Sequence, residues 1–477
     1  MTMNAERFYI DGAWVEPLGG GSMPIMDPAQ NAKIGTVALG TAADVDRAVD
    51  VATRAFEEFG LWPKAERLAL LRRIRLGTAA RQEDLAWAMC HEMGAPISMA
   101  RAMQAEAGIG HADGFIEALA KQDERWTLPN GDTLTREPIG PVGAITPWNW
   151  PINQIALKVL PALATGCPVI LKPSEHTPLS AQLYAEILHE AGVPAGAFAL
   201  IHGTGPEVGE TLSTHPGLAM VSFTGSTRAG IAVSKAAAET VKRVTLELGG
   251  KSPNLVFADC GAALAERVRY AVAECFLNTG QSCDAPTRLI VERACYDEVL
   301  EIAEAAAKAI KVSDPKQEGD HLGPLFDQLQ WDRVQALIAK GIDEGARLLA
   351  GGLGKPEGLE HGWYARPTVF ADVTPEMTIA RQEIFGPVLS ILPAEDEAEM
   401  IALANATDYG LAAYIQTGDP MRAERVARRL RAGAVHINGG GLGWGTPFGG
   451  YKASGNGREG GMQGLEDYQE VKSLHFG

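Results

Sequence analysis

The stretch VGAITPWNWPINQIALKVLPALATGCPVILK, residues 142–172, decides the predicted fold. It opens with a short apolar run at 142–146 and closes with a second at 168–172. Between them, apolar residues recur at helical spacing from Ile152 to Leu163. Two short apolar strands joined by a helix are typical of a βαβ unit. This stretch therefore predicts two parallel strands with a covering helix.

The same alternation continues along the chain and predicts an α/β protein. Further strands are expected at 198–201, 219–223 and 244–248, with helices at 179–191 and 228–238. A second α/β unit follows Gly249-Gly250, with expected elements at 262–277, 289–291, 296–310, 411–415 and through Val426 to Leu430. Upstream, helices are expected within 42–81 and from about Met99 to Ala120. Such alternation indicates parallel sheets covered on both faces.

Two segments depart from this pattern. Residues 126–128 and 133–137 flank Pro129-Asn130-Gly131-Asp132, which predicts a hairpin with an Asn-Gly turn. A lone hairpin is marginal in water, so we expect it to pack on something, such as another subunit. Residues 438–461 are rich in glycine and predict a long functional loop.

Composition narrows the class of protein. The 477 residues suit two or three domains, and the net charge of −17 disfavours nucleic-acid and membrane partners. No apolar run approaches the ~18 residues of a membrane-spanning helix, and no signal peptide is visible. The six cysteines lack paired spacing, which favours reduced thiols and a cytoplasmic location. The histidines show no metal-ligand spacing, so no metal site is expected.

Three side chains suggest covalent chemistry on a carbonyl group. Cys283 supplies a thiol, Glu247 a carboxylate at the end of an apolar strand, and Asn149 a side-chain amide between prolines. If they converge, the thiol can attack a carbonyl carbon, the amide can stabilise the oxyanion and the carboxylate can activate water. Considered alone, Cys283 is more simply a core cysteine and Asn149 a turn residue.

The motifs around these residues resemble the aldehyde dehydrogenase superfamily over nearly the whole chain. Seven motifs stand in the order typical of that family. They are Pro147-Trp148-Asn149-Trp150-Pro151, Lys172-Pro173-Ser174-Glu175, Phe223-Thr224-Gly225-Ser226, Glu247-Leu248-Gly249-Gly250, Gly280-Gln281-Ser282-Cys283, Glu383-Ile384-Phe385-Gly386-Pro387 and Pro447-Phe448-Gly449-Gly450.

The resemblance implies an architecture for the whole chain. It implies a variant Rossmann cofactor domain over 1–122 and 142–249 and an α/β catalytic domain over 250–445. It also implies a small β oligomerisation arm, formed by 123–141 and 460–477, in a homodimer or homotetramer. The expected partner is a small-molecule aldehyde.

The resemblance also assigns roles to the catalytic candidates. It implies that Cys283 is the nucleophile, that Asn149 donates to the oxyanion and that Glu247 activates water to hydrolyse the thioester. Lys158 and Glu459 match positions tied to proton relay, although a solvated surface pair is an equal interpretation. Relatives that transfer the acyl group to coenzyme A generally lack the glutamate, so Glu247 favours hydrolysis. A coenzyme A-acylating enzyme and a non-catalytic structural relative stay as alternatives.

The implied cofactor is NAD, with NADP left open. The run 203–209 does not form a regular GxGxxG fingerprint, so the resemblance carries this expectation. A carboxylate at Glu175 favours NAD, because it accepts from a ribose 2′-hydroxyl and repels a 2′-phosphate. The cofactor-binding candidates are Thr146, Trp148, Lys172, Ser174, Glu175, Gly205, Gly209, Phe223, Thr224, Gly225, Ser226, Leu248, Glu383 and Phe385.

The substrate pocket is where this chain departs from its family. Asp284 follows the nucleophile, where a small or aliphatic residue is expected, so it raises the thiol pKa, binds a polar substrate group or points away. No arginine stands among the pocket candidates, which favours a neutral or cationic aldehyde. These candidates are Trp150, Gln154, Leu157, Ser282, Asp284, Leu442, Trp444 and Phe448.

Overall fold

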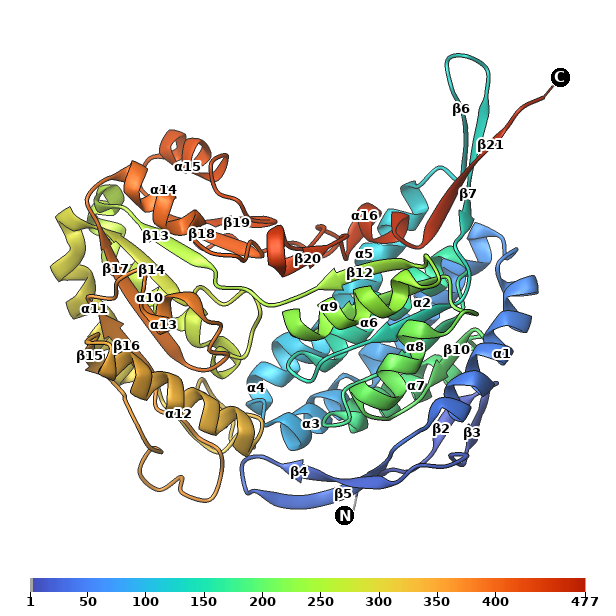
Figure 1. Ribbon diagram of the computed structural model, residues 1–477, viewed down its shortest axis with the longest axis horizontal. Helices are drawn as coiled ribbons and strands as arrows, with labels where there is room; N and C mark the ends of the chain where they lie inside the picture. The colour runs from blue at the N-terminus through green and yellow to red at the C-terminus, as the bar shows by residue number, and fades with distance from the viewer. Residues whose placement is uncertain (1–2, 477) are drawn as a thin grey trace.

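The computed structural model describes residues 3–476 and contains two large sheets side by side (Figure 1). The eight-stranded sheet has the order β20-β12-β11-β8-β9-β10-β2-β3 and the seven-stranded sheet the order β15-β16-β17-β14-β13-β18-β19. Strand β12 ends at Glu247 in the first sheet and β13 begins at Pro253 in the second. The chain therefore passes from one sheet to the other within five residues, 248–252.

The opening stretch forms the centre of the eight-stranded sheet, and the predicted βαβ unit is confirmed. Strands β8 (Val142–Ile145) and β9 (Val169–Lys172) are parallel, and α6 (Pro151–Thr165) joins them. The helix begins with proline at its first turn and ends at Gly166, whose φ of 90° is left-handed. The neighbouring parallel strands are β10 (Phe198–Leu200), β11 (Met220–Thr224) and β12 (Arg243–Glu247).

Both faces of this sheet are covered by helices, as the apolar strands predict. Alternate residues of a strand face opposite sides. Val169 and Leu171 of β9 pack in one core cluster with α6 and α7 (Pro178–Glu190), whereas Ile170 packs in another. That second cluster includes residues of α1 (Ala42–Phe59), α8 (Glu210–Thr214) and α9 (Thr227–Ala238).

The seven-stranded sheet is built in the same way. Helices α10 (Leu264–Phe276) and α11 (Tyr296–Ala309) share one core cluster with its strands, and α14 (Glu397–Asn405) and α15 (Pro420–Ala427) share another. The strands are β13 (Pro253–Val256), β14 (Arg288–Glu292), β15 (Arg347–Ala350), β16 (Thr368–Ala371), β17 (Val388–Ala394), β18 (Ala412–Gln416) and β19 (Ala434–Ile437).

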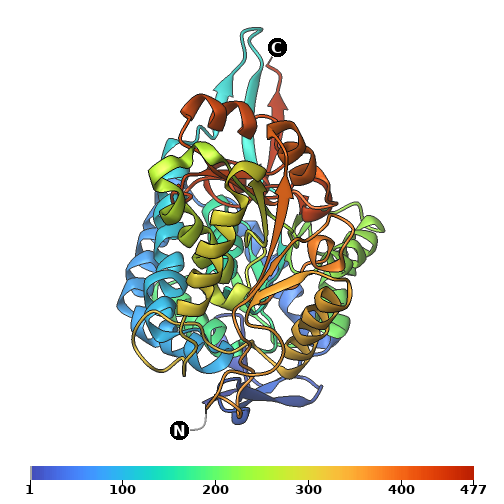
Figure 2. The ribbon, with the colours of Figure 1, turned by 90° about the vertical axis from the view of Figure 1, so that its left-hand side faces the viewer.

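The predicted hairpin is present and gains a third strand from the C-terminal segment. Strands β6 (Arg125–Thr127) and β7 (Thr133–Pro138) are antiparallel, and β21 (Gln469–Leu474) pairs with β7. Figures 1 and 2 show this small sheet projecting at the end of the molecule opposite the N-terminus. The guanidinium of Arg136 lies 4.5 Å from the ring centre of Trp126 and stiffens the projection.

Several elements differ from the sequence predictions. The helix expected from Met99 is a short α4 (Ile97–Met99), a π-helical segment over Ala100–Ala105 and α5 (Glu106–Lys121). The helix expected to reach Leu430 ends at Ala427, where α15 finishes. The elements not predicted include α3 (Gln82–Met93), α12 (Gln328–Asp343) and the N-terminal strands β1 (Met3–Ala5), β2 (Phe8–Ile10), β3 (Ala13–Val15), β4 (Ser22–Asp27) and β5 (Ala32–Ala38).

Between residues 3 and 476, no helix is long and apolar enough to cross a membrane. Within the same residues, no group of three or more histidine, cysteine, aspartate or glutamate side chains is arranged to hold a metal ion.

Candidate functional site

Cys283 lies on a tight turn between α10 and β14. Asn278, Thr279 and Gly280 precede it with φ values of 53°, 57° and 71°, all left-handed. A β-carbon at Gly280 would stand 2.2 Å from the carbonyl oxygen of Gly386. Only glycine fits this approach, so the backbone before the thiol is held against the Gly386 turn.

Hydrogen bonds fix Asn149 beside this turn. The side-chain amide of Asn149 donates to the carbonyl oxygen of Gln281 at 3.0 Å. In return, the side-chain amides of Asn278 and Gln104 donate to the carbonyl oxygen of Asn149 at 2.9 and 3.2 Å. The turn between β8 and α6 is therefore tied to the Cys283 turn, although the two are far apart in the sequence.

A single cavity brings the three predicted catalytic side chains together. It encloses about 680 Å³, including the space at its open mouth. Cys283, Glu247 and Asn149 line it. So do Pro147, Trp148, Gln154, Thr224, Gly225, Ser226, Leu248, Gly249, Gln330, Arg333, Glu383 and Phe385.

Glu247 ends β12 and is 3 % exposed. Neither of its carboxyl oxygens has a hydrogen-bond partner among residues 3–476. Burial raises the pKa of this carboxyl well above its usual range, and the charge of Glu459 raises it further. A β-carbon at Gly449 would lie 2.6 Å from its Oε1 atom, so the glycine-rich loop closes directly over the carboxyl.

Lys158 and Glu459 form a buried ion pair and do not line the cavity. The surface interpretation of these residues is therefore wrong, because Lys158 has no exposed surface and Glu459 is 3 % exposed. Lys158 also donates to the hydroxyl of Ser222 at 3.1 Å. The effect of Glu459 on the pKa of Glu247 shows that the ion pair and the carboxyl are electrostatically linked.

The surroundings of Cys283 favour a protonated thiol. Burial raises the pKa of Cys283 well above its usual range, and the carboxylates of Asp284, Glu383 and Glu247 act in the same direction. The sequence left three roles for Asp284, and its charge does raise the thiol pKa. A thiol in this environment needs a base to take its proton when it attacks.

A turn over residues 383–385 forms another part of the cavity wall. The Oε1 atom of Glu383 accepts from the backbone of Gly250 at 3.1 Å. Two side chains of α12 support this turn: Arg333 donates to the carbonyl of Glu383 at 2.7 Å and Gln330 to that of Phe385 at 2.7 Å. Gln330 and Arg333 were not predicted from the sequence as site residues. Their spacing of three residues on one helix face was the available signal.

Other predicted cofactor-binding residues lie at the ends of strands β11 and β9. Phe223 and Thr224 end β11, and Ser226 caps α9 by accepting from Ala229 at 3.3 Å. Lys172 ends β9 and pairs with Glu175 at 2.9 Å. A β-carbon at Gly209 would lie 4.0 Å from the Lys172 side chain, which places the 205–209 helix beside that pair.

Other cofactor candidates are held by local contacts. Thr146 donates its backbone N–H to the carbonyl of Lys172 at 3.1 Å, and its buried hydroxyl has no partner among the described residues. The Ser174 hydroxyl accepts from His176 at 3.3 Å. Trp148 stacks on Phe326 with ring centres 4.1 Å apart. Thr146, Lys172, Ser174, Glu175, Gly205, Gly209 and Phe223 do not line the central cavity.

Of the predicted substrate-pocket residues, only Gln154 lines the central cavity. Trp150 donates to the hydroxyl of Ser282 at 2.8 Å, which holds both beside the nucleophile. Trp444 rests on α5, because a β-carbon at Gly110 would come within 2.2 Å of its ring. The others outside the cavity are Leu157, which is buried, Leu442, which is exposed, and Asp284 and Phe448, which are intermediate.

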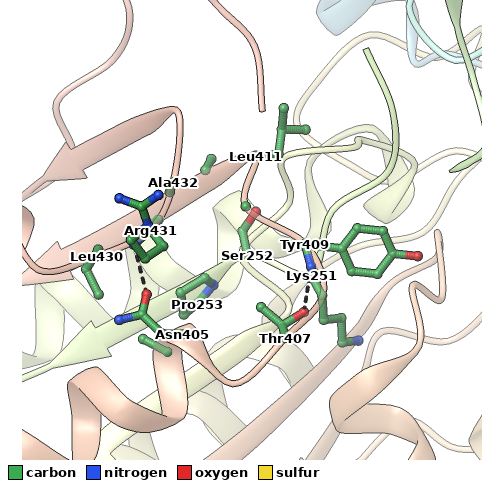
Figure 3. Close-up of a pocket in the computed structure, with 14 residues that line it drawn as sticks. Lys251, Ser252, Pro253, Asn405, Thr407, Tyr409, Leu411, Leu430, Arg431 and Ala432 are labelled. Atoms are coloured by element: carbon green, nitrogen blue, oxygen red, sulfur yellow. Dashed lines mark hydrogen bonds between the residues drawn. The ribbon is translucent and has the colours of Figure 1, made fainter. Parts of the chain in front are cut away.

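A second, smaller cavity lies apart from these residues (Figure 3). Lys251 and Ser252 line it on one side, and burial lowers the pKa of Lys251 to about 7. On the other side, the side chain of Asn405 accepts from the backbone of Arg431 at 2.8 Å. None of the predicted site residues lines this cavity, so we do not place the chemistry there.

Comparison with known proteins gives consistent matches. The sequence profile of the aldehyde dehydrogenase family matches residues 14–474. The 3-succinoylsemialdehyde-pyridine dehydrogenase of a Pseudomonas species is 49% identical over 470 residues, 98% of each chain. A Bartonella henselae aldehyde dehydrogenase structure is 46% identical, with a TM-score of 0.97 over 99% of each chain. A mutant aldehyde dehydrogenase C of Pseudomonas syringae, in complex with NAD⁺ and octanal, is 48% identical, with a TM-score of 0.97 over 98% of this chain and 96% of that one.

Proposed function

This chain belongs to the aldehyde dehydrogenase family, and from that premise we propose that it oxidises an aldehyde to the carboxylic acid with NAD. The observation that carries the proposal is the convergence of Cys283, Glu247 and Asn149 on one cavity. The thiol, carboxyl and amide come from three distant segments, and each has the chemistry that one step of the reaction needs.

In the first step, the sulfur of Cys283 bonds to the aldehyde carbon. One N–H of the Asn149 amide is held by Gln281 at 3.0 Å, which leaves the second N–H for the oxyanion. A donor of this kind stabilises the transition state by about 2.7–4 kcal/mol. The thiol proton passes to Glu247, because the raised pKa of that carboxyl makes it a competent acceptor.

In the second stage, the thiohemiacetal on Cys283 loses hydride and becomes a thioester. NAD, when bound, supplies the hydride acceptor. Glu247 then takes a proton from water, the water oxygen bonds to the thioester carbon and the carbon–sulfur bond breaks to release the acid. The buried Lys158–Glu459 pair is the proposed outlet for the Glu247 proton, because its charge is linked to that carboxyl.

The donor set of the cavity fits a nicotinamide dinucleotide. The buried Thr224 hydroxyl has no partner among the described residues, and Ser226 opens α9 where backbone N–H groups favour phosphate. Glu383 and Phe385 are proposed to hold the nicotinamide ribose and ring, as the family motif implies. Lys172 and Glu175 are proposed to hold the adenosine ribose.

Replacing Glu175 by glutamine should shift cofactor preference toward NADP. Burial acts against ionisation of Glu175, but the charge of Lys172 prevails and holds the pKa below its usual range. The carboxylate therefore repels a 2′-phosphate, and its loss also frees Lys172 to bind one. We expect the NADP/NAD ratio of kcat/KM to rise by about tenfold or more. An unchanged ratio would place the 2′-position away from Glu175, and Glu186→Gln, on α7, is the matched control.

The decisive experiment is a panel of aliphatic, aromatic and amino aldehydes assayed with NAD and with NADP. Appearance of NADH without coenzyme A supports the proposal, and absence of signal across the panel would overturn it. A product that requires coenzyme A would instead indicate the acylating alternative. Binding of the cofactor without turnover of any aldehyde would indicate a non-catalytic relative.

We propose further that the protein works as a homodimer or homotetramer in the cytoplasm. The projecting β6–β7–β21 sheet supports assembly, because so small a sheet is marginal unless a partner covers it. Six cysteines without a disulfide among the described residues support a reducing compartment.

A further inference from the structure

Gln104 lies against the proposed oxyanion donor Asn149 and is fully buried. It belongs to the π-helical segment 100–105. Its side-chain nitrogen, Nε2, donates to the backbone carbonyl oxygen of Asn149 at 3.2 Å. The same nitrogen lies 3.4 Å from the Oδ1 atom of Asn278 and 3.4 Å from the sulfur of Met93. One amide therefore contacts both the segment of the oxyanion donor and the turn that precedes the nucleophile.

The orientation of the Gln104 amide follows from its surroundings. The backbone oxygen of Asn149 and the Oδ1 atom of Asn278 can only accept, so the group that faces them is the NH₂ of Gln104 and not its oxygen. The Asn278 amide is oriented in the same way, because its own nitrogen donates to the Asn149 carbonyl at 2.9 Å. The three residues thus form a closed triangle, in which two amides from distant segments hold the backbone of Asn149.

Packing alone does not account for an amide at this position. The Oε1 atom of Gln104 is buried and has no partner among residues 3–476. An apolar side chain of the same length would fill the same space without an unpaired oxygen, and an unpaired buried oxygen opposes folding. The nitrogen is therefore the atom that distinguishes glutamine here, and its shortest contact is with Asn149.

The π-helical segment determines the direction in which this amide points. A π-helical turn holds one residue more than an α-helical turn, and one residue turns a side chain by about 100° around the helix axis. Without that extra residue, Gln104 would lie on a different face relative to α4. The irregular turn is thus part of what brings the amide to Asn149.

We infer that Gln104 is a positioning residue for the oxyanion donor. It holds the backbone of Asn149, while the Gln281 carbonyl holds one N–H of the Asn149 side chain at 3.0 Å. The other N–H is then kept at one place in the cavity, ready for the oxyanion. Gln104 does not line the cavity and acts only through Asn149. The inference rests on the proposed function, because it takes Asn149 as the donor to the oxyanion.

The test is a double-mutant cycle of Gln104→Met and Asn149→Ala. Methionine has a similar length but no N–H, so the Asn149 carbonyl keeps only its Asn278 donor. The variant removes the unpaired Oε1 and leaves Oδ1 of Asn278 unpaired instead, so the melting temperature should change little. The single-turnover rate constant of NADH formation should fall by about tenfold. The dissociation constant for NAD, measured by tryptophan fluorescence, should stay the same.

Asn149→Ala alone should lower the single-turnover rate by roughly 10²–10³-fold. In that background Gln104→Met should have no further effect, because the amide that Gln104 positions is gone. Gln416→Met is the matched control. Gln416 is also fully buried with an unpaired Oε1, but it donates to Asn254 and does not line the cavity. Any loss that this control causes should be the same in both backgrounds.

Losses that multiply in the double variant would overturn the inference and show that Gln104 only fills space. An unchanged rate in Gln104→Met with Asn149 intact would also overturn it. If the methionine variant does not fold, Gln104→Leu in the same cycle gives the same reading. Full activity in Asn149→Ala would instead overturn the oxyanion role in the proposed function, and this inference with it.

Discussion

Replacing Cys283 by alanine is expected to lower steady-state NADH formation by roughly 10⁴–10⁶-fold, the scale of losing a covalent nucleophile. Alanine retains the backbone turn but cannot form a bond to the aldehyde carbon. The cofactor candidates lie on other elements, so NAD should still bind to the variant. Quenching of tryptophan fluorescence on titration with NAD measures that binding, because Trp148 lines the cavity.

Cys295→Ala provides the control for this experiment. Cys295 is another free thiol and is buried, but it lies at the start of α11 and does not line the cavity that contains Cys283. Its replacement should leave turnover close to that of the parent protein. Retention of activity in Cys283→Ala would show that another group attacks the aldehyde. An equal loss in both variants would indicate damage to folding.

Replacing Glu247 by glutamine is expected to leave a slower burst of one NADH per subunit and to lower the later steady rate by roughly 10²–10⁴-fold. The burst slows because water must take the thiol proton in place of the carboxyl. Glutamine has the same shape but cannot take a proton from water, so the thioester on Cys283 accumulates. Rapid mixing with aldehyde and NAD measures the burst. Mass spectrometry of the quenched protein should then find the acyl group on Cys283.

The pH dependence of the steady rate tests the same assignment. Burial and the charge of Glu459 raise the pKa of Glu247, so the carboxyl ionises at a higher pH than an ordinary glutamate. Because the base must be ionised, the steady rate should increase toward alkaline pH, and this increase should disappear in Glu247→Gln. Glu247→Asp, which keeps a carboxylate, should recover part of the rate. A burst as fast as that of the parent protein would contradict the role of Glu247 in taking the thiol proton, and absence of an acyl group on Cys283 in Glu247→Gln would contradict its role in hydrolysis.

The elements that could be predicted are those whose own residues carry the signal. Strands β8 and β9 are short apolar runs and α6 has regular helical spacing, so local periodicity is sufficient. The N-terminal strands were missed because they are short and their apolar residues do not mark the buried face. In β4 the buried positions alternate regularly, but one of them is Asp27, whereas Pro24 and Met26 are exposed. The π-helical segment at 100–105 was missed because hydrophobic spacing does not distinguish it from an α-helix.

The residues of the candidate site show the same distinction between those that a local pattern marks and those that tertiary packing places. Cys283, Glu247 and Asn149 stand in motifs, so their chemistry can be predicted residue by residue. Arg333 can donate to the Glu383 carbonyl only because α12 packs beside that turn. Trp444 can pack against α5 only because residue 110 is glycine. These are contacts between segments fifty or more residues apart or between side chains without a motif. Such contacts follow from tertiary packing and leave no local pattern in the sequence.

The pairing of β12 with β20 (Gly455–Asn456) has a consequence for the order of events during synthesis. Glu247 lies opposite Gly455 in this pairing, and the backbone of Leu248 donates to the Ser454 carbonyl at 3.0 Å. On the ribosome, β20 is synthesised about two hundred residues after Glu247, the proposed base that it pairs beside. In the proposed mechanism, the nascent chain therefore carries its nucleophile long before the hydrolytic half of the site is complete, and the whole site is assembled only when the last segment folds back.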